Sequence, residues 1–372
     1  MTLVVGVPRE IKDGEFRVAL TPDGVQELVA HEVSVLVEAD AGAGSAFTDD
    51  NFRGAGAEIA PTADDVWERA GLIVKVKEPQ PDEFARLRPG LALFTFLHLA
   101  AYREVAEQLL ARKVTGIAYE TVQDASGALP LLAPMSEVAG RMAPQIGAHF
   151  LERDRGGRGV LLGGAPGVRP ARVVVLGAGN VGWNAAWIAR GMEAEVQLLD
   201  KNLDRLRWVD QIHQGRIMTL ASNRGAIARA VAKADLVIGA VLVAGGRAPV
   251  VVNEDMVRSM KPGAVIIDVA VDQGGCVETT RETTHADPVY VIHDVLHYAV
   301  GNIPGGVPHT STYALTNATL PYVLALATHG RAAAIEADPE LARGVNTCEG
   351  NVTNPAVAAA LGKPFVPFAG GR

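Results

Sequence analysis

The chain has 372 residues, a formal net charge of −8, 48% hydrophobic residues and 20% charged residues. This length is typical of two domains, and the composition excludes a disordered chain, which could not bury enough apolar surface. The acidic balance argues against a non-specific nucleic-acid binder, which needs a basic face. The two cysteines lie outside any CxxC pair, so they indicate neither a zinc site nor a disulfide framework.

The N-terminal segment predicts a first strand and not a signal peptide. It has no basic region before its apolar stretch, and Pro8 cuts that stretch short. The most apolar run, residues 91–101, is too short to span a bilayer. We therefore expect a cytoplasmic protein with neither a membrane partner nor a nucleic-acid partner.

The first 130 residues alternate short apolar runs with amphipathic ones. This alternation predicts a mostly parallel sheet covered by helices. Thr21 followed by Pro22 marks a helix start, because the hydroxyl caps the helix and proline suits its first position. The expected strands are 4–7, 33–37, 72–76, 91–96 and 114–118, and the expected helices are 22–30, 62–69 and 102–112.

A second α/β series begins near Ala171, after a segment, 134–153, that is helical in composition. A helical, alanine-rich region follows Pro304 and includes a long buried helix expected over 313–329. We predict an α/β protein of two domains, each a mostly parallel sheet flanked by helices. The first domain is expected to be discontinuous, residues 1–133 and 305–372, with the second, 134–304, inserted in it. The elements expected in the second series are strands 172–176, 195–199, 235–241, 264–269 and 289–292 and helix 180–190.

A glycine-rich loop carries the strongest local signal. Gly177, Gly179 and Gly182 form GxGxxG directly after a predicted strand and at the start of a predicted helix. The first glycine permits the tight turn, the second lets a pyrophosphate approach the helix N-terminus, and the third lets helix and strand pack closely. The second domain is therefore predicted to be a Rossmann dinucleotide-binding fold.

Asp200 ends the next predicted strand, 18 positions beyond Gly182, where the ribose-binding acid of this motif lies. A carboxylate there accepts a hydrogen bond from a ribose 2′-hydroxyl and repels a 2′-phosphate. The sequence therefore favours NAD over NADP as cofactor. A role for Asp200 as a helix cap is compatible with this one.

Cations follow three predicted strands of the first domain. Arg17 lies in a turn between strand and helix, Lys75 and Lys77 end a buried strand, and His98 follows another. Ligands in open α/β sheets bind at the carboxyl ends of strands, and an arginine with a lysine suits a substrate carboxylate. Each lysine alone is more often a solvated strand end, and His98 alone fits a satisfied core histidine.

Acidic residues and histidines also stand out in the second domain. Asp268 and Asp272 end a buried strand just before two glycines, where carboxylates are rarely structural without partners. His293 and His297 have the i,i+4 spacing of a metal-binding pair, but no third ligand of suitable spacing follows. We expect no metal there.

Taken together, the motifs resemble those of the alanine dehydrogenase and NAD-transhydrogenase alpha-subunit family over the whole chain. The matching segments are 15–22, 75–79, 93–99, 134–141, 239–242, 268–275 and 310–317. The resemblance implies NAD-dependent oxidative deamination of L-alanine to pyruvate and ammonium, reversible as reductive amination. It also implies two domains with the active site in the cleft between them, and a homohexamer.

The resemblance assigns roles to residues that match the family's motifs. Arg17 and Lys77 would bind the substrate, and His98 and Asp272 would be the acid/base pair. Some members bind magnesium with a glutamate four residues before a histidine, but Ala325 stands there ahead of His329, so no metal is expected. The NAD site would be lined by Ser136, Gly177, Gly179, Asn180, Val181, Gly182, Asp200, Arg205, Ser222, Val241, Leu242, Val269, Ala270, Val271, Asp272, Arg281, Val300, Gly301, Asn302 and Ile303.

Reaction chemistry gives independent support for the acid/base pair. When Cα loses hydride the amine becomes an imine, and water must then be activated. An imidazole such as His98 ordinarily titrates near neutrality, which suits proton transfer, and Asp272 would orient the amine and water. Two alternatives remain: the soluble NAD-binding subunit of a proton-translocating transhydrogenase, or a non-catalytic NAD-binding regulator. The first would lack an amino-acid site, and the second would not need Asp272.

Overall fold

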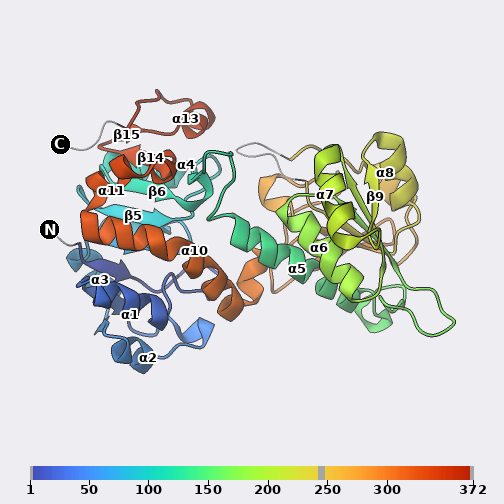
Figure 1. Cartoon of the computed structure of the whole chain (residues 1–372), viewed down its shortest axis with the longest axis horizontal. Coiled ribbons are helices and arrows are strands. Elements are labelled where there is room, and N and C mark those ends of the chain that lie inside the picture. Colours follow the sequence, from blue (N-terminus) through green and yellow to red (C-terminus); the bar gives the residue numbers. More distant parts are fainter. Residues whose placement is uncertain (1–2, 242–247, 369–372) are drawn as a thin grey trace. The chain divides into compact units, whose positions relative to one another are not determined.

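The computed structural model describes residues 3–241 and 248–368, and the chain divides into two compact units. Unit 1 contains Met1–Met135 and Val307–Arg372, and unit 2 contains Ser136–Gly306. Helix α5 (Ala133–Phe150) begins in unit 1 and ends in unit 2 (Figure 1). Unit 2 is thus an insertion in the sequence of unit 1.

Unit 1 is built on an eight-stranded sheet with the order β15-β14-β6-β5-β4-β1-β2-β3. The neighbours from β6 to β3 pair in parallel, whereas β14 and β15 are antiparallel additions at one edge. The chain runs from β1 outward to β3 and then returns to β4 on the other side of β1, so the strand order reverses between β1 and β4. The strands are β1 (Val5–Val7), β2 (Val35–Glu38), β3 (Glu58–Ala60), β4 (Leu72–Val74), β5 (Ala92–Thr95), β6 (Thr115–Ala118), β14 (Val345–Cys348) and β15 (Asn351–Val352).

Helices flank this sheet and close its core. Helix α10 packs along α1 (Figure 1) and also contacts β4. Helices α3, α4 and α13 contribute Trp67, Leu109 and Leu361 to a buried cluster with the strand residue Leu93. The helices are α1 (Pro22–Ala30), α2 (Asp49–Gly54), α3 (Ala63–Arg69), α4 (Arg103–Ala111), α10 (Pro308–His329), α11 (Arg331–Ala337), α12 (Pro339–Gly344) and α13 (Pro355–Leu361), with short 3-10 helices at η1 (Ala43–Ser45), η2 (Pro81–Arg86) and η3 (Tyr119–Thr121).

Local sequence explains where several helices begin. The Thr21 hydroxyl accepts a hydrogen bond from the Gly24 amide at 3.1 Å and Pro22 occupies the first turn of α1, which confirms the predicted start. Asn202 caps α7 (Leu203–His213) in the same way, with its side chain accepting from the amides of Asp204 and Arg205. These caps satisfy amide groups that a helix leaves without an internal partner.

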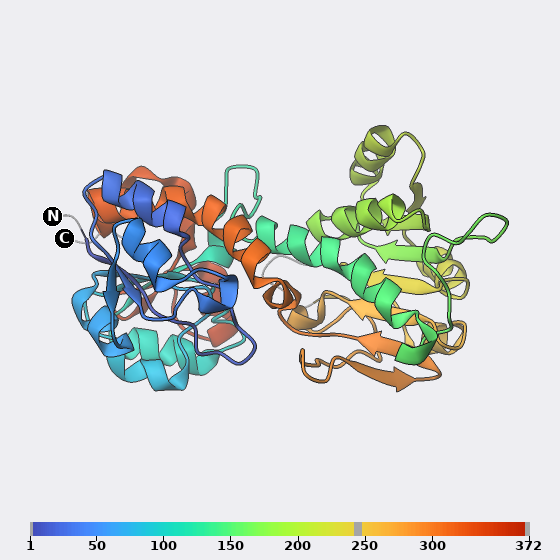
Figure 2. The ribbon, with the colours of Figure 1, turned by 90° about the horizontal axis from the view of Figure 1, so that it is seen from below.

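Unit 2 is built on a seven-stranded sheet with the order β12-β13-β11-β10-β7-β8-β9. All neighbouring pairs from β13 to β9 are parallel, and β12 is an antiparallel edge strand. Figure 2 shows these strands in colours from green to orange. The strands are β7 (Arg172–Leu176), β8 (Glu195–Asp200), β9 (Met218–Ala221), β10 (Leu236–Gly239), β11 (Val265–Asp268), β12 (Val289–Ile292) and β13 (Val295–Tyr298).

The helices of unit 2 pack against this sheet through small and aliphatic side chains. Helix α6 lies on β7 and β8, while α8 and α9 supply Val231 and Val257 to a buried cluster with Val237 of β10. The remaining elements are α6 (Asn180–Gly191), α8 (Arg224–Val231), α9 (Glu254–Arg258) and the 3-10 turns η4 (Arg153–Arg155), η5 (Val271–Gln273) and η6 (Ile303–Gly306). In the described residues no helix has the length and apolar character that crossing a membrane requires.

The structure departs from the sequence-based prediction in several places. Strand β4 ends at Val74 and not at residue 76, so Lys75 and Lys77 both follow it. Helix α10 begins five residues earlier than predicted, at Pro308. The β12–β13 hairpin was not predicted in full: His293 and Asp294 form its two-residue turn with φ of 54° and 59°, as in a type I′ turn.

The third glycine of the loop gives a test of this packing. A Cβ at Gly182 would lie 1.7 Å from the Gly177 carbonyl oxygen, so Gly182→Ala must push α6 away from the end of β7. Overpacking of this kind costs about 1–3 kcal/mol. We expect a lower urea unfolding midpoint. Among the described residues outside its own helix backbone and chain neighbours, no atom lies within 4 Å of the would-be Cβ of Gly191 in the same helix, so Gly191→Ala should leave the midpoint unchanged or raise it. Equal effects of the two substitutions would contradict this account.

Candidate functional site

The carboxyl ends of the parallel strands in unit 2 gather the residues expected at a nucleotide. Since these strands run in one direction, the segments that follow them share one edge of the sheet. The strand order reverses between β7 and β10, and the loops after these two strands touch: a Cβ at Gly177 would lie 2.5 Å from the Ala240 carbonyl oxygen. Ligands of open α/β sheets bind at such a reversal.

The glycine loop has the conformation that the motif requires. Gly177 has φ of 103°, which favours glycine, and its amide donates to the Leu199 carbonyl at 2.7 Å. Gly179 precedes the first turn of α6, and among the described residues beyond its chain neighbours the one atom within 4 Å of its would-be Cβ is Arg205 Nη1 at 3.9 Å. The loop therefore has room for a ligand beside the helix N-terminus, where free amides favour an anion.

Asp200 is a buried carboxylate at the end of β8. Its Oδ2 accepts from the Ala178 amide at 2.6 Å and its Oδ1 from the Asn202 amide at 2.7 Å. Arg205 Nη1 lies 4.0 Å from Oδ2. These contacts fix the carboxylate beside the glycine loop. A carboxylate has about four lone-pair sites, so it retains the capacity to accept from a ligand hydroxyl.

Most of the other residues named for this site follow the same strand ends. Ser222 follows β9, Val241 follows β10, and the remaining sets follow β11 and β13, while Ser136 lies in α5. Arg281 lies between η5 and β12, with its guanidinium 4.2 Å from the centre of the Tyr290 ring. Leu242 lies outside the described residues. The β11 set is Val269, Ala270, Val271 and Asp272, the β13 set is Val300, Gly301, Asn302 and Ile303, and Asn180 and Val181 open α6.

Asp268 and Asp272 occupy different environments. Asp268 is fully buried and accepts from the amides of Ala270, Cys276 and Val277, so it holds the loop after β11 in shape. Burial raises the pKa of its carboxyl. Asp272 is exposed in η5, near Gly301, whose would-be Cβ lies 3.1 Å from the Asp272 Oδ1. Of the two acids, Asp272 is the one that a ligand can reach.

In unit 1, Arg17 is a buried cation held by its neighbour Glu15. The Arg17 Nε donates to Glu15 Oε1 at 2.7 Å and its Nη2 to Glu15 Oε2 at 2.5 Å, while Nη1 donates to the Met135 sulfur at 3.0 Å. Burial would raise the pKa of Glu15, but the Arg17 guanidinium, with a further contribution from Lys77, lowers it to about 2. Glu15 is therefore ionised and orients the guanidinium.

Lys75 and Lys77 differ sharply although they are two residues apart. Lys75 is fully buried, with its Nζ 2.8 Å from Glu83 Oε1 and 3.2 Å from Glu10 Oε2. Its anionic partners are thus side chains of unit 1 itself, and its role is structural. Lys77 is only partly buried and lies near the carboxylates of Glu15 and Glu78. Only Lys77 remains a candidate for binding a substrate.

His98 follows β5 with a strained backbone. Its φ is 47°, in the left-handed region, and its amide donates to Glu120 Oε1 at 2.6 Å while the Leu97 amide donates to Oε2 at 3.2 Å. The ring stacks on Phe96, with centroids 5.6 Å apart, and its Nδ1 lies 3.8 Å from Glu78 Oε2. Such strain persists only where neighbours hold it in place, here the Glu120 carboxylate.

The structure thus brings Arg17, Lys77 and His98 to one edge of the unit 1 sheet. They follow β1, β4 and β5, which pair in parallel, so the segments after them lie side by side. Sequence reasoning gave no role to Glu15, Glu78 or Glu120, the carboxylates that hold these groups. For Arg17 and Lys77 the usable signal was a nearby acidic residue in the same segment, whereas the carboxylates beside His98 come from other segments.

The two histidines with metal-like spacing have separate partners. His293 lies in the β12–β13 turn with its Nε2 2.7 Å from Glu254 Oε1, and His297 is buried in β13 with its Nε2 2.8 Å from the Thr279 hydroxyl. The spacing of four therefore spans a hairpin turn and not one face of a helix. In the described part of the chain, no three His, Cys, Asp or Glu side chains are arranged to hold a metal ion.

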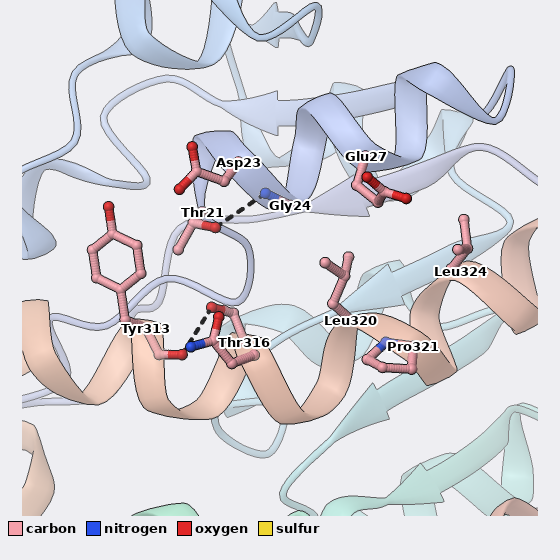
Figure 3. A pocket seen from close by; sticks show the side chains of 10 residues that line it. Thr21, Asp23, Gly24, Glu27, Tyr313, Thr316, Leu320, Pro321 and Leu324 are labelled. Atoms are coloured by element: carbon pink, nitrogen blue, oxygen red, sulfur yellow. Dashed lines mark hydrogen bonds between the residues drawn. The ribbon is translucent and has the colours of Figure 1, made fainter.

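A hollow of about 510 Å³ lies elsewhere in unit 1, between α1 and α10 (Figure 3). Asp23 and Glu27 line it from α1, and Tyr313 and Leu320 line it from α10. It contains none of the cations described above, and its two carboxylates disfavour an anionic ligand. We do not assign the reaction to it.

The fold and the two sheet edges define a two-unit α/β protein with a dinucleotide-binding loop in one unit and a cluster of cations in the other. Residues 6–139 match the family model for the N-terminal domain of alanine dehydrogenase/PNT, and residues 143–355 match the model for its C-terminal domain. The chain belongs to the alanine dehydrogenase/PNT family.

Individual relatives match over nearly the whole chain. It is 57% identical to an alanine dehydrogenase of Mycobacterium tuberculosis over 361 residues, with 97% of each chain covered. It is 54% identical to one of Bacillus subtilis over 366 residues, with 98% of this chain and 96% of the relative covered. A solved L-alanine dehydrogenase superposes with a TM-score of 0.93 at 50% identity, covering 96% of this chain and 99% of the other. A solved transhydrogenase from Sinorhizobium meliloti superposes with a TM-score of 0.81 at 25% identity, covering 95% of this chain and 99% of the other.

The Arg17–Glu15 pair predicts a pH dependence of stability. The folded pKa of Glu15, about 2, lies below its unfolded value of 4.5, so the pair stabilises the fold fully above pH 4.5 and loses this effect as pH falls toward 2. A shift of this size is worth about 3 kcal/mol. Glu15→Gln should lower the free energy of unfolding by roughly that amount at pH 7.

The measurement is urea unfolding of both proteins at pH 7, 4 and 3. The difference between them should shrink as pH falls below 4.5. Glu58→Gln, which removes an exposed carboxylate paired with Arg69, is the control and should change little at any pH. A difference that stays constant from pH 7 to 3 would show that the ion pair is not its source.

Proposed function

We propose that the protein catalyses the NAD-dependent oxidative deamination of L-alanine to pyruvate and ammonium, reversible as the reductive amination of pyruvate. The observation that carries this proposal is the nearly full-length identity to alanine dehydrogenases. The cation cluster of unit 1 and the glycine loop of unit 2 supply the two kinds of binding group that the reaction needs. The substrate role is assigned to residues 1–133 and 305–372, and the NAD role to residues 134–304.

The glycine loop and Asp200 fit NAD. The open space beside Gly179 and the free amides of the first turn of α6 suit the pyrophosphate, and the fixed Asp200 carboxylate suits a ribose hydroxyl. The segments after β10, β11 and β13 would line the nicotinamide half. When bound, NAD supplies the redox chemistry by accepting a hydride from Cα of the substrate.

Arg17 and Lys77 would bind the substrate. The guanidinium of Arg17 is oriented by Glu15, so it offers a fixed planar donor set that suits a carboxylate. Lys77 adds a second positive charge at the same edge and would bind the carbonyl oxygen of pyruvate. Both product and substrate carry a carboxylate, so this pair serves the reaction in either direction.

His98 and Asp272 would carry out the proton transfers. Deamination requires a proton acceptor for the water that adds to the imine, and imidazole suits this near neutral pH. The exposed Asp272 carboxylate would orient the amine and then the water. Because His98 belongs to unit 1 and Asp272 to unit 2, the proposal requires that both units serve the same substrate.

The transhydrogenase alternative has less support. The match to the transhydrogenase is at 25% identity, against 50% to 57% for the alanine dehydrogenases. A non-catalytic NAD-binding regulator would have no use for the oriented Arg17 or for Asp272. We also propose that the protein is cytoplasmic and forms a homohexamer, as the family resemblance implies. Light scattering coupled to size exclusion would test this assembly directly as six copies of the 39.0-kDa chain.

The decisive assay is NADH formation from NAD and L-alanine, with serine and glycine as matched substrates and pyruvate plus ammonium for the reverse direction. L-alanine should give the highest kcat/KM of the three amino acids. Tight NAD binding without any turnover would favour the regulator, and the deamination proposal would be withdrawn.

The acid/base roles predict large losses of rate with intact cofactor binding. Asp272→Asn keeps the shape but removes the charge, and His98→Ala removes the imidazole. Each should lower turnover by about 10²–10⁴-fold. NADH affinity, measured by fluorescence titration, should stay close to wild type. Turnover near wild type in either variant would remove that residue from the mechanism.

Asp200 predicts the choice of cofactor. The wild type should use NAD far better than NADP, because the carboxylate repels a 2′-phosphate. Asp200→Ser removes this charge and should narrow the ratio of the two kcat/KM values, mainly through weaker use of NAD. Since Asp200 also holds Ala178 and Asn202, the unfolding midpoint is measured in parallel. Equal use of both cofactors by the wild type would refute the assignment.

A further inference from the structure

Two buried polar atoms face each other in unit 1 without a hydrogen bond. His98 Nδ1 and Glu78 Oε2 are 3.8 Å apart, and neither has a hydrogen-bond partner in the described part of the chain. A buried polar group left unsatisfied costs about 1–3 kcal/mol. Two such atoms side by side, beside a residue assigned to proton transfer, call for a functional explanation.

Glu78 is held firmly by its other oxygen. It is 2% exposed, and its Oε1 accepts from Lys12 Nζ at 2.5 Å and from Gln80 Nε2 at 3.3 Å. Oε2 is therefore left on the side of the imidazole. Burial would raise the pKa of Glu78, but His98 and Lys12 lower it to about 2, so the group is a carboxylate at neutral pH.

The other groups around the ring fix its place and leave Nδ1 to Glu78. Phe96 stacks on the imidazole and Tyr102 meets it edge-on at 6.3 Å between centroids. Lys12 Nζ also donates to the Tyr102 hydroxyl at 3.2 Å, and Glu120 binds the backbone amide of His98 rather than its ring. Among these neighbours and Lys77, which lies close to Glu78, only Glu78 presents an acceptor to Nδ1.

We propose that Glu78 is a positioning residue for His98, accepting a hydrogen bond from Nδ1–H and leaving Nε2 to exchange protons with the substrate. The carboxylate fixes the tautomer and stabilises the imidazolium that forms when Nε2 takes up the proton released by water addition. The proton stays on the ring and is not passed to Glu78. Catalytic hydrogen bonds are often long before substrate binds and tighten in the complex, which accounts for the 3.8 Å separation. This inference rests on the proposed function.

The competing explanation is that Glu78 serves only to hold Lys12. The two explanations differ in what Lys12→Met does, since this change removes the ion pair but leaves the carboxylate beside the ring. If Glu78 acts on His98, Lys12→Met should retain most of the turnover that Glu78→Gln loses. Equal losses in the two variants would overturn the proposal.

The main test compares Glu78→Gln and Glu78→Asp with the wild type. Glu78→Gln should lower kcat at least about tenfold, with the KM for pyruvate and NADH affinity within about twofold. The limb of the pH–rate profile that His98→Ala abolishes should move to lower pH by about one unit, because imidazolium loses its anionic neighbour. Glu78→Asp keeps the charge and should recover part of both effects.

The matched control is Glu38→Gln. Glu38 is another buried carboxylate, the last residue of β2 in the same sheet, and it accepts from the Arg9 amide at 2.8 Å, away from the groups assigned to the reaction. It should leave kcat and the pH profile unchanged. If Glu78→Gln also leaves both unchanged, or if Glu38→Gln reproduces its effects, the proposal is wrong.

A second measurement does not depend on turnover. Diethyl pyrocarbonate modifies neutral imidazole, and mass spectrometry of the peptide that contains His98 gives its rate against pH. The pH at the midpoint of this rate curve should be lower in Glu78→Gln than in wild type. If the glutamine variant does not fold, Glu78→Asp replaces it, with a smaller shift of the midpoint in the same direction. An unchanged midpoint would overturn the inference. A wild type that fails to oxidise alanine would refute the proposed function alone.

Discussion

Burying a cation requires a carboxylate beside it, and this constraint organises the edge of the unit 1 sheet. Lys75 is fully buried only because Glu83 and Glu10 lie within 3.2 Å of its ammonium. Arg17 is buried because Glu15 meets its guanidinium with both oxygens. The Lys75–Glu10 pair joins the segment after β4 to the segment after β1, so it also ties two loops at this edge together.

This constraint has a pH signature of its own. Burial, with help from nearby carboxylates, raises the pKa of Glu10 to about 7 although Lys75 opposes the shift. The folded state therefore favours the protonated form of Glu10 more than the unfolded state does, and ionising it costs stability as pH rises from 4.5 through 7. The pKa of Glu15 shifts in the opposite direction, downward, because the effect of Arg17 outweighs that of burial. Neighbouring glutamates at one edge thus differ in charge state according to whether burial or the nearby cation dominates.

Much of the architecture could be predicted from the sequence because the chain repeats strong local signals. Apolar runs of four or five residues predicted β7 and β12 to the residue, and the Thr21–Pro22 start predicted α1. Short strands such as β3 and β9 were missed since they are three or four residues long and partly exposed, so they carry no apolar run. Strand β14 lies far along the chain from its partner β6, and nothing local marks such a pairing.

Only part of the candidate site could be predicted from the sequence, and the reason is physical. The glycine loop and Asp200 are set by backbone geometry, which a local motif encodes, and the structure places Asp200 against the loop. The cations were also visible, but the carboxylates beside His98 come from other segments, unlike Glu15, which is two residues from Arg17. Glu120 is 22 residues from His98, and Lys12 is 66 residues from Glu78. Which acid meets which base depends on strand order, and a single sequence does not state that order.

Lys75 and Lys77 show how pairing with carboxylates distinguishes a structural lysine from one that is a candidate for binding substrate. They have the same side chain and lie two positions apart, so an extended strand would turn both to one face of the sheet. Strand β4 ends at Val74, so the alternation of a strand does not continue through Lys75 and Lys77, and the two side chains lie in different surroundings. Glu10 and Glu83 hold the first in the interior, whereas the second stays partly exposed near Glu15 and Glu78. The carboxylates packed behind the edge therefore decide how many cations this edge presents to an anionic substrate.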